Sequence, residues 1–211
     1  MKKGFTLAEV LITLGIIGVV ASITMTSLIA EHQKLVTVTK LKKAYNVLNN
    51  AIRLAEVEHG DKSKWGDSNN DECGLYIYNH YVRGKLKVLK DVEDTGSNCQ
   101  SDPEIVLADG IVLDSFINWS PLSRDAFTVD INGAAGPNKV GRDRFDFFYS
   151  SKYGYAPAGF CDHPEWSPSD CVATDGSRND VKNAGCNERS KFLCGALIMM
   201  DGWQIKDDYP W

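Results

Sequence analysis

Glu9 is the residue near the start of the chain whose type and position could do chemistry. It is the only ionisable side chain in the 26 residues from Phe5 to Ala30. A carboxylate inside an apolar helix costs about 2.5 kcal/mol or more on membrane-insertion scales, so it indicates a function and needs a partner. Cleavage just before Phe5 would create an amino group. A neighbouring helix, shifted by about one turn, could then place its Glu9 against that amine and neutralise both charges.

Six cysteines form a second candidate group, and all of them follow residue 72. They are Cys73, Cys99, Cys161, Cys171, Cys186 and Cys194. An even number of cysteines beyond an export segment favours disulfides in an oxidising compartment. Fifteen pairings are possible; we expect Cys73 to pair with Cys99 and the other four to pair among themselves. The alternative is a zinc site, but the chain has no Cys-x-x-Cys motif and only four histidines.

An oxygen-rich loop is a candidate for a calcium site. Asp130, Asn132 and Asp143 bring oxygen ligands of the kind that calcium prefers. The spacing is not that of an EF-hand loop, because no Glu stands at its twelfth position. Turns formed by Asn and Asp explain the same residues without a metal. No other cofactor is suggested.

The sequence contains no recognisable catalytic motif. A nucleophile elbow, a Walker loop, a His-Glu-x-x-His motif and a Rossmann glycine pattern are all absent, so we do not expect an enzyme. Nucleic acid is not an expected partner either, since residues 31–211 carry 21 Lys and Arg against 27 Asp and Glu.

The segment that carries Glu9 is long enough to cross a membrane. About 20 apolar residues span a bilayer core of about 30 Å. Lys2 and Lys3 precede the segment, which favours a cytoplasmic N-terminus and export of the rest. Two alternatives are a secretory signal peptide, with Val19-Val20-Ala21 as its cleavage site, and a plain membrane anchor. Glu9 counts against both.

The start of the chain, Gly4-Phe5-Thr6-Leu7-Ala8-Glu9 followed by the apolar run, resembles the N-terminus of type IV pilin-like proteins. This family includes pilins, type II secretion pseudopilins and competence pilins. The resemblance covers about 30 residues of the 211. It implies cleavage after Gly4 by a prepilin peptidase, N-methylation of Phe5, and Glu9 as the carboxylate that acts in assembly. One departure is that Thr24-Met25-Thr26 occupies a region where the family often has a proline.

The resemblance implies a domain order and a set of partners. Residues 1–4 would be the leader, residues 5–30 the transmembrane and assembly helix, and residues 31–211 an exported head. The expected partners are the prepilin peptidase, other pilin or pseudopilin subunits, an inner-membrane assembly platform and, before assembly, the lipid bilayer. The protein would lie in the bacterial inner membrane with a cytoplasmic N-terminus, and later in a filament outside the cytoplasm.

The sequence is compatible with three functions, which belong to different classes of protein. The first is a structural subunit of a type IV pilus or of a secretion pseudopilus. The second is a minor pilin at the filament tip, with an adhesin-like head that binds a surface, a sugar or DNA, although the net negative charge of residues 31–211 weakens the DNA version. The third, a secreted enzyme behind a signal peptide, lacks a recognisable site.

Helical periodicity continues beyond the apolar segment. Apolar residues recur every three or four positions from Leu35 to Ala55, and Gly60 is a suitable residue to end the helix after His59. The pattern predicts one helix over residues 5–59, of which residues 31–59 are amphipathic and pack against the head. The alternative is a membrane helix followed by a separate amphipathic helix.

The rest of the head has the pattern of short strands and turns. Residues 105–113 predict a hairpin around Asp109-Gly110, and residues 127–131 and 145–149 predict two further strands. Residues 197–205 predict a second hairpin around Asp201-Gly202. Shorter structured pieces are expected at residues 75–82 and 86–89. The fold class is therefore α+β: a long N-terminal helix packed on a small antiparallel sheet, with a loop region held by disulfides.

Overall fold

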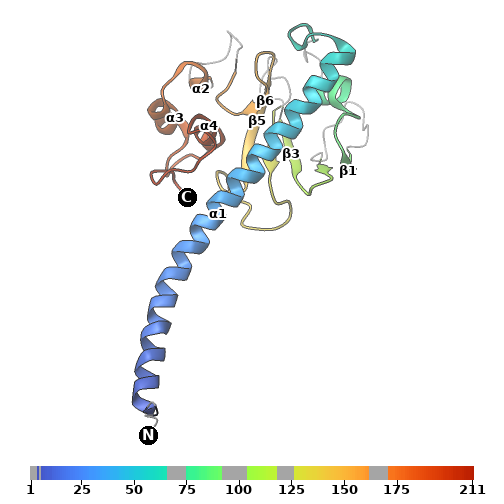
Figure 1. Ribbon diagram of the computed structural model, residues 1–211. Coiled ribbons are helices and arrows are strands. Elements are labelled where there is room, and N and C mark those ends of the chain that lie inside the picture. Colours follow the sequence, from blue (N-terminus) through green and yellow to red (C-terminus); the bar gives the residue numbers. More distant parts are fainter. Residues whose placement is uncertain (1–3, 5, 66–74, 92–103, 118–125, 162–170) are drawn as a thin grey trace. The chain divides into compact units, whose positions relative to one another are not determined.

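The computed structural model describes residues 4, 6–65, 75–91, 104–117, 126–161 and 171–211 (Figure 1). The chain divides into two compact units, residues 1–36 and residues 37–211. The first helix, α1, extends from Leu7 to His59 and contributes to both units. The single helix predicted over residues 5–59 is confirmed, with its beginning two residues later than expected.

In the second unit, one side of α1 is buried. Eight residues spaced three or four apart line this side: Thr37, Val38, Leu41, Ala44, Leu48, Ala51, Ile52 and Ala55. This spacing places them on one face of a helix with 3.6 residues per turn. The predicted apolar stripe is thus confirmed from Val38 onward, whereas Leu35 is 64% exposed.

The end of α1 is fixed by a glycine and a tryptophan. Gly60 has a φ of +79°, which a residue without a Cβ adopts at little cost, and its N–H donates to the Glu56 carbonyl at 2.9 Å. The Trp65 indole N–H then donates to the Gly60 carbonyl at 2.9 Å. The chain therefore leaves the helix where the sequence predicted.

Six antiparallel strands form one sheet, and their order in the sheet follows the chain. They are β1 (Val88–Lys90), β2 (Ile105–Leu107), β3 (Val112–Ile117), β4 (Ala126–Asp130), β5 (Arg144–Ser150) and β6 (Gly154–Pro157). The predicted hairpin is confirmed as β2 and β3, with Gly110 at a φ of +83° in the turn. The strands predicted at residues 127–131 and 145–149 are confirmed as β4 and β5.

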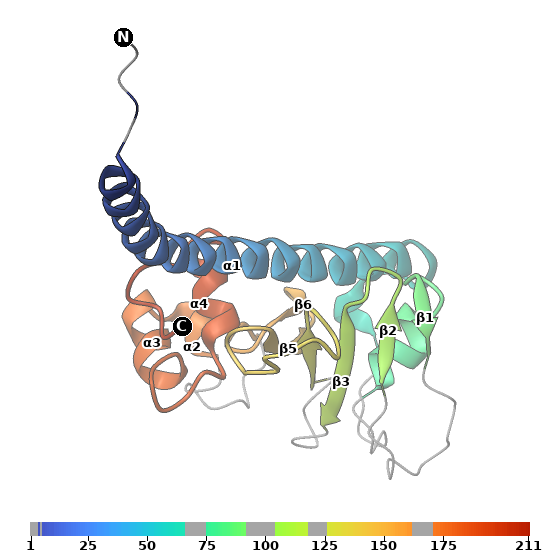
Figure 2. The ribbon, with the colours of Figure 1, turned by 90° about the horizontal axis from the view of Figure 1, so that it is seen from below.

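The inner face of the sheet packs aromatic side chains beneath α1. Phe127 of β4 contacts Tyr155 of β6 edge to face, with ring centroids 5.0 Å apart. The Asn49 amide of α1 donates to the Tyr155 carbonyl at 2.6 Å. Gly154 allows this close approach, because a Cβ at that position would lie 2.1 Å from the Asn49 side-chain oxygen. Figure 2 shows the strands on one side of this part of α1.

Two short helical turns precede the sheet. They are η1 (Lys62–Lys64) and η2 (Tyr78–Val82), and η2 together with β1 accounts for the structured pieces expected at residues 75–82 and 86–89. The Tyr78 hydroxyl donates to the Asp91 carboxylate at 2.6 Å, and burial of the hydroxyl raises the pKa of Tyr78.

Three helices lie after the sheet: α2 (Val172–Asp175), α3 (Arg178–Gly185) and α4 (Cys194–Met200). The hairpin predicted over residues 197–205 is wrong, because residues 197–200 belong to α4 and Asp201-Gly202 is the turn that ends it. A short apolar run does not distinguish a strand from a buried helix. Here Leu193, Leu197 and Ile198 are all buried at helical spacing, and α4 packs against β5 and β6.

Candidate functional site

Thr6 and Glu9 form a capping box at the beginning of α1. The Thr6 N–H and hydroxyl both donate to Glu9 Oε2 at 2.8 Å, and the Glu9 N–H donates to the Thr6 hydroxyl oxygen at 3.3 Å. Such a pair satisfies backbone N–H groups that have no partner within the helix. The Thr-x-x-Glu spacing is a sequence signature of this arrangement, so the role of Thr6 could have been predicted but was missed.

The candidate processing position precedes this cap. Gly4 is exposed and lies outside α1, with no heavy atom within 4 Å of the position that a Cβ would take. Phe5, the predicted methylation site, lies outside the described residues. Gly4 therefore stands where a peptidase could reach it without unwinding α1.

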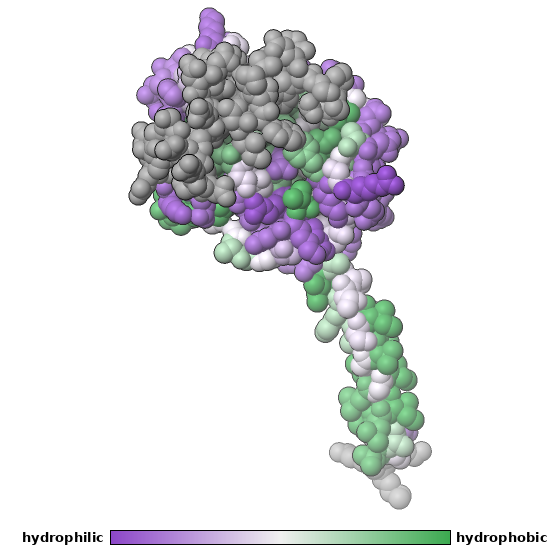
Figure 3. Space-filling view, turned by 180° about the vertical axis from the view of Figure 1, so that it is seen from behind, coloured by the Kyte–Doolittle hydropathy of each residue, from purple (hydrophilic) through white to green (hydrophobic). Residues whose placement is uncertain are grey.

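The apolar part of α1 that follows Glu9 exposes its side chains within its own unit. Leu14, Ile23 and Leu28 are all at least 60% exposed. Figure 3 shows apolar side chains over the surface of this segment. By length and composition, α1 is a helix that can cross a membrane. Exposed apolar surface of this extent indicates a lipid or protein partner.

Hydroxyl side chains in this segment bond to the backbone of their own helix. The hydroxyls of Ser22, Thr24, Thr26 and Ser27 each donate to a carbonyl three or four residues earlier, at 2.8 to 3.3 Å. These bonds satisfy polar groups that lipid would leave without a partner. They also explain how Thr24 and Thr26, in the region where type IV pilin-like proteins often have a proline, fit into an apolar helix.

Two disulfides hold the C-terminal part of the head. Cys161 pairs with Cys171, and Cys186 pairs with Cys194, so these four cysteines pair among themselves as predicted. Each bridge joins residues close in sequence, with separations of 10 and 8. The predicted Cys73–Cys99 bridge lies outside the described residues.

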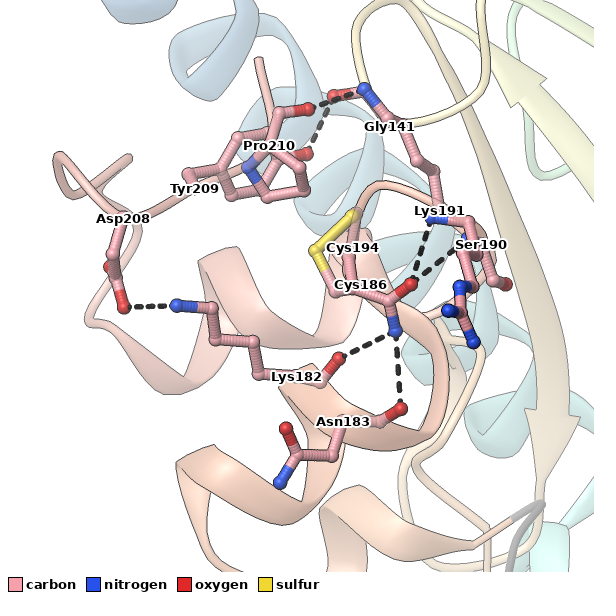
Figure 4. The surroundings of a disulfide bond; sticks show 12 residues. Gly141, Lys182, Asn183, Cys186, Ser190, Lys191, Cys194, Asp208, Tyr209 and Pro210 are labelled. Carbon is pink, nitrogen blue, oxygen red and sulfur yellow. Dashed lines mark hydrogen bonds and ion pairs between the residues drawn. A yellow bond between two sulfur atoms is a disulfide. The ribbon is translucent and has the colours of Figure 1, made fainter.

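The Cys186–Cys194 bridge lies between α3 and α4, in a network of hydrogen bonds shown in Figure 4. The Asn187 side-chain amide donates to the Lys182 and Asn183 carbonyls, both at 3.1 Å. Its side-chain oxygen accepts from the backbone N–H groups of Arg189 and Ser190. The segment between the two cysteines is thus held at both ends and along its length.

The C-terminal tail is attached to the same region. The Lys191 ammonium donates to the Pro210 carbonyl, and the Tyr209 hydroxyl donates to the Gly141 carbonyl, both at 2.5 Å (Figure 4). The Arg142 guanidinium lies over the Trp211 ring, 4.7 Å from its centroid. Burial raises the pKa of Tyr209. The last three residues are therefore packed against the loop that precedes β5.

Arg178 organises a network of charges around the tail. Its Nε donates to both oxygens of Asp201, and its two terminal nitrogens donate to Asp208 at 2.6 and 2.8 Å. Hydrogen bonds from Arg178 and Lys182 hold the pKa of Asp208 well below its usual range. Burial alone would raise the pKa of Asp201, but hydrogen bonds from Arg178 and Lys206 outweigh it, so this pKa is lowered too.

The calcium candidates lie between the end of β4 and the start of β5: Asp130 ends β4, and Asn132 and Asp143 follow in the loop. The two carboxylates accept from backbone N–H groups, whereas the buried Asn132 side-chain oxygen has no hydrogen-bond partner among the described residues. Asp143 accepts from the N–H groups of Asn138 at 2.7 Å and Lys139 at 2.6 Å, and Asp130 accepts from the Asn132 N–H at 3.1 Å. Burial raises the pKa of Asp130, and the nearby Asp143 adds to the shift. Within the described part of the chain, no group of three or more His, Cys, Asp or Glu could hold a metal ion. Calcium binding stays a prediction.

Comparisons with known proteins give two matches to families. Residues 27–211 match a family of unknown function, DUF6613, and residues 1–25 match the prokaryotic N-terminal methylation motif. No curated protein and no solved structure matches the chain. The methylation motif is the N-terminal signal of type IV pilins and pseudopilins, which indicates a structural protein rather than an enzyme. The chain belongs to family DUF6613 and begins with this pilin-type motif.

Proposed function

We propose that the protein is a structural subunit of a type IV pilus or a type II secretion pseudopilus, assembled through α1. The observation that carries this proposal is the methylation motif over residues 1–25, which coincides with the exposed apolar part of α1. A helix of this kind is stable in lipid before assembly and in a bundle of like helices afterwards.

Processing is the first step of the proposed mechanism. A prepilin peptidase cuts between Gly4 and Phe5 and releases the Phe5 amine, which is then methylated. Lys2 and Lys3 leave with the leader, so the side-chain charge of the chain changes from -5 to -7. The cut leaves Thr6, and with it the cap of α1, in place.

Glu9 acts in the second step. In the separate chain, Thr6 donates two hydrogen bonds to the Glu9 carboxylate. In the filament, the Phe5 amine of a neighbouring subunit approaches this carboxylate and forms an ion pair. Because an unpaired charge in an apolar environment is costly, this pairing favours one register between neighbouring helices. The partners are the peptidase, like subunits and the inner-membrane assembly platform.

Mass spectrometry of the protein extracted from bacterial membranes tests the processing step. We expect a chain that begins at Phe5 and carries one additional methyl group. The same protein from a strain without the peptidase should retain Met1. A chain from the wild-type strain that begins at Met1, or at Ser22 after a signal-peptide cut, would refute the proposal.

Substitution of Glu9 tests the assembly step. We expect Glu9→Ala to abolish incorporation into sheared filaments, because the neighbouring amine would lose its counter-charge. Glu9→Gln is the matched control for side-chain shape and should fail as well, since it lacks the charge. The second unit should remain folded in both variants, as judged by its protease resistance. Normal filaments from either variant would disprove the assigned role of Glu9.

A further inference from the structure

Positive charge is concentrated in one part of α1. Residues 32–55 contain five Lys and Arg and no Asp or Glu, although the whole chain has a net charge of -5. Residues 56–211 contain 16 Lys and Arg against 26 Asp and Glu, a net charge of -10. An ordinary solvated helix face carries interspersed charges of both signs. This segment of α1 does not.

Three of these five basic residues, Lys42, Lys43 and Arg53, lie on the side of α1 that faces away from the sheet, whereas Lys34 and Lys40 are half-buried. We call this side the outer stripe; its residues are Lys42, Lys43, Asn46, Asn50, Arg53, Leu54 and Val57. Five of them, Lys42, Asn46, Asn50, Arg53 and Val57, recur at intervals of three or four, and Lys43 and Leu54 lie beside them. Every member is exposed. In Figure 2, the strands lie along the other side of this part of α1.

The cations of the outer stripe are only partly neutralised within the head. Lys43 forms an ion pair with Asp109 at 2.9 Å. Lys42 and Arg53 form no ion pair with any residue that the structure describes. The stripe therefore has unused positive charge.

Apolar side chains adjoin these cations. Leu54 is 48% exposed and Val57 is 87% exposed. Both follow Arg53 on the same side of α1. Apolar contact area beside arginine is typical of protein interfaces, whereas a purely electrostatic contact would not need it.

We propose that the outer stripe is the docking surface for acidic side chains of residues 56–211 in a second copy of this chain. The argument rests on the proposed function, because a filament brings identical heads side by side. Residues 56–211 of the second copy supply the net negative charge that complements Lys42 and Arg53. Complementary charges speed encounter and fix register, while Leu54 and Val57 supply apolar area at the contact. The contact makes the filament at least partly a polymer of this one chain.

Zero-length cross-linking of full-length protein in filaments tests this contact. A carbodiimide joins a lysine amine to a carboxylate that touches it. Filaments assembled from a mixture of ¹⁴N- and ¹⁵N-labelled protein separate links between copies from links within one copy. We expect Lys42 to be joined to an Asp or Glu of residues 56–211 in mixed-isotope pairs. The link between Lys43 and Asp109 should stay within one copy and serves as an internal control.

Charge reversal measures the contribution of the stripe to assembly. We expect the double variant Lys42→Glu and Arg53→Glu to reduce incorporation into filaments by roughly tenfold or more, because like charges would face each other. The matched control is Lys64→Glu with Arg189→Glu, which changes the net charge equally at exposed positions away from the stripe. This control should retain incorporation within about twofold.

Each outcome of these experiments decides the proposal. Mixed-isotope links at Lys42 together with the selective loss in the stripe variant support it. Links from Lys42 only to other proteins, or no link between copies, would overturn it, as would equal incorporation of the stripe variant and the control. If the stripe variant does not accumulate, the cross-links alone decide. Failure of wild-type protein to form filaments would overturn the proposed function, whereas the other negative results would leave that function intact.

Discussion

At the scale of single residues, Thr6 stabilises the Glu9 carboxylate before any neighbour is present. Both donors of Thr6, the N–H and the hydroxyl, bond to the same oxygen of Glu9 at 2.8 Å. The carboxylate is therefore already ordered at the first turn of α1 in the single chain. Glu9 is predicted from its position in an apolar segment. The role of Thr6 follows from a different pattern, the Thr-x-x-Glu spacing that marks the N-terminus of a helix.

Substitution of Thr6 tests this pairing. We expect Thr6→Val to reduce filament incorporation, because it removes the hydroxyl bond to Glu9 and the acceptor for the Glu9 N–H while keeping the side-chain shape. Thr6→Ser keeps both groups and is the matched control. The measurement is the ratio of filament to membrane-bound protein. Equal ratios for the Val and Ser variants would show that the cap has no role in assembly.

At the same scale, Arg178 connects the tail to α3 through two carboxylates. Both Asp201 and Asp208 have a lowered pKa in the folded chain. Stability from these pairs is therefore present above the ordinary aspartate pKa of about 3.9, and it is lost as the pH falls through the lower pKa of the folded state. Salt screens the exposed Asp208 pair more than the buried Asp201 pair.

We expect Arg178→Gln to increase hydrogen exchange of residues 201–211 at pH 7. The difference from wild type should shrink as the pH falls below about 4, because the carboxylates become protonated. Hydrogen exchange with mass spectrometry across this pH range measures both effects. Arg189→Gln, at an exposed position outside the network, is the control. A difference that is independent of pH would contradict the role of the two carboxylates.

At the scale of elements, the bridge between Cys186 and Cys194 holds α4 against the end of α3. Both cysteines are fully buried, and the bridge spans eight residues. In the chain-entropy account, a bridge across a loop of this size stabilises the folded state by about 2–3 kcal/mol. The Asn187 hydrogen bonds within the loop add local order.

Replacement of both cysteines by alanine tests this contribution. We expect the free energy of unfolding to fall by about 2–3 kcal/mol, measured by denaturant titration in detergent. Alanine avoids the buried hydroxyl that serine would introduce. Treatment of the wild-type protein with a reductant should lower its stability by at least as much. Unchanged stability of the double variant would contradict a structural role for this bridge.

Elements with strong local signals could be predicted, and elements set by packing could not. The end of α1 at His59 and the β2–β3 turn at Asp109-Gly110 follow from glycines that allow a positive φ. The strand β6 could not be predicted, because its four residues Gly154–Pro157 are too few to show an alternating pattern and form a strand only by pairing with β5. The apolar run of residues 197–200 fits a strand and a helix equally well. The packing of α4 against β5 and β6 makes it a helix.

The candidate site was predictable to a similar degree. Glu9 and the pairing of the last four cysteines among themselves followed from residue type and position. The Arg178 network could not be predicted, since Arg178 and Asp208 are 30 residues apart and meet only once α3 and the tail are in place. The outer stripe required knowledge of which side of α1 is buried.

At the scale of the whole molecule, the second unit buries its apolar residues, whereas the first unit leaves its apolar residues exposed. The buried residues of α1 all lie at or after Thr37, and the most apolar window of the helix is 0% buried. The core of the second unit is therefore made from that unit alone.

We predict that residues 31–211, produced in an oxidising compartment, fold as a soluble domain. Circular dichroism and size-exclusion chromatography should show a monomer with helix and strand that unfolds cooperatively. The same fragment with Leu41→Asp is the control, because a charge at this fully buried position should prevent folding. Aggregation of the unaltered fragment under oxidising conditions would contradict the prediction.

The order of the elements along the chain also determines how the head completes its fold during export. Each strand pairs with its sequence neighbour, so the sheet grows by local contacts as the chain emerges. By contrast, Thr37 bonds to the Arg142 carbonyl and Asn49 to the Tyr155 carbonyl, across 105 and 106 residues. In the proposed topology, Thr37 and Asn49 are exported before Arg142 and Tyr155, so they gain these two partners only after β5 and β6 have followed. Until then this side of α1 lacks part of its cover, which the last strands and α4 complete.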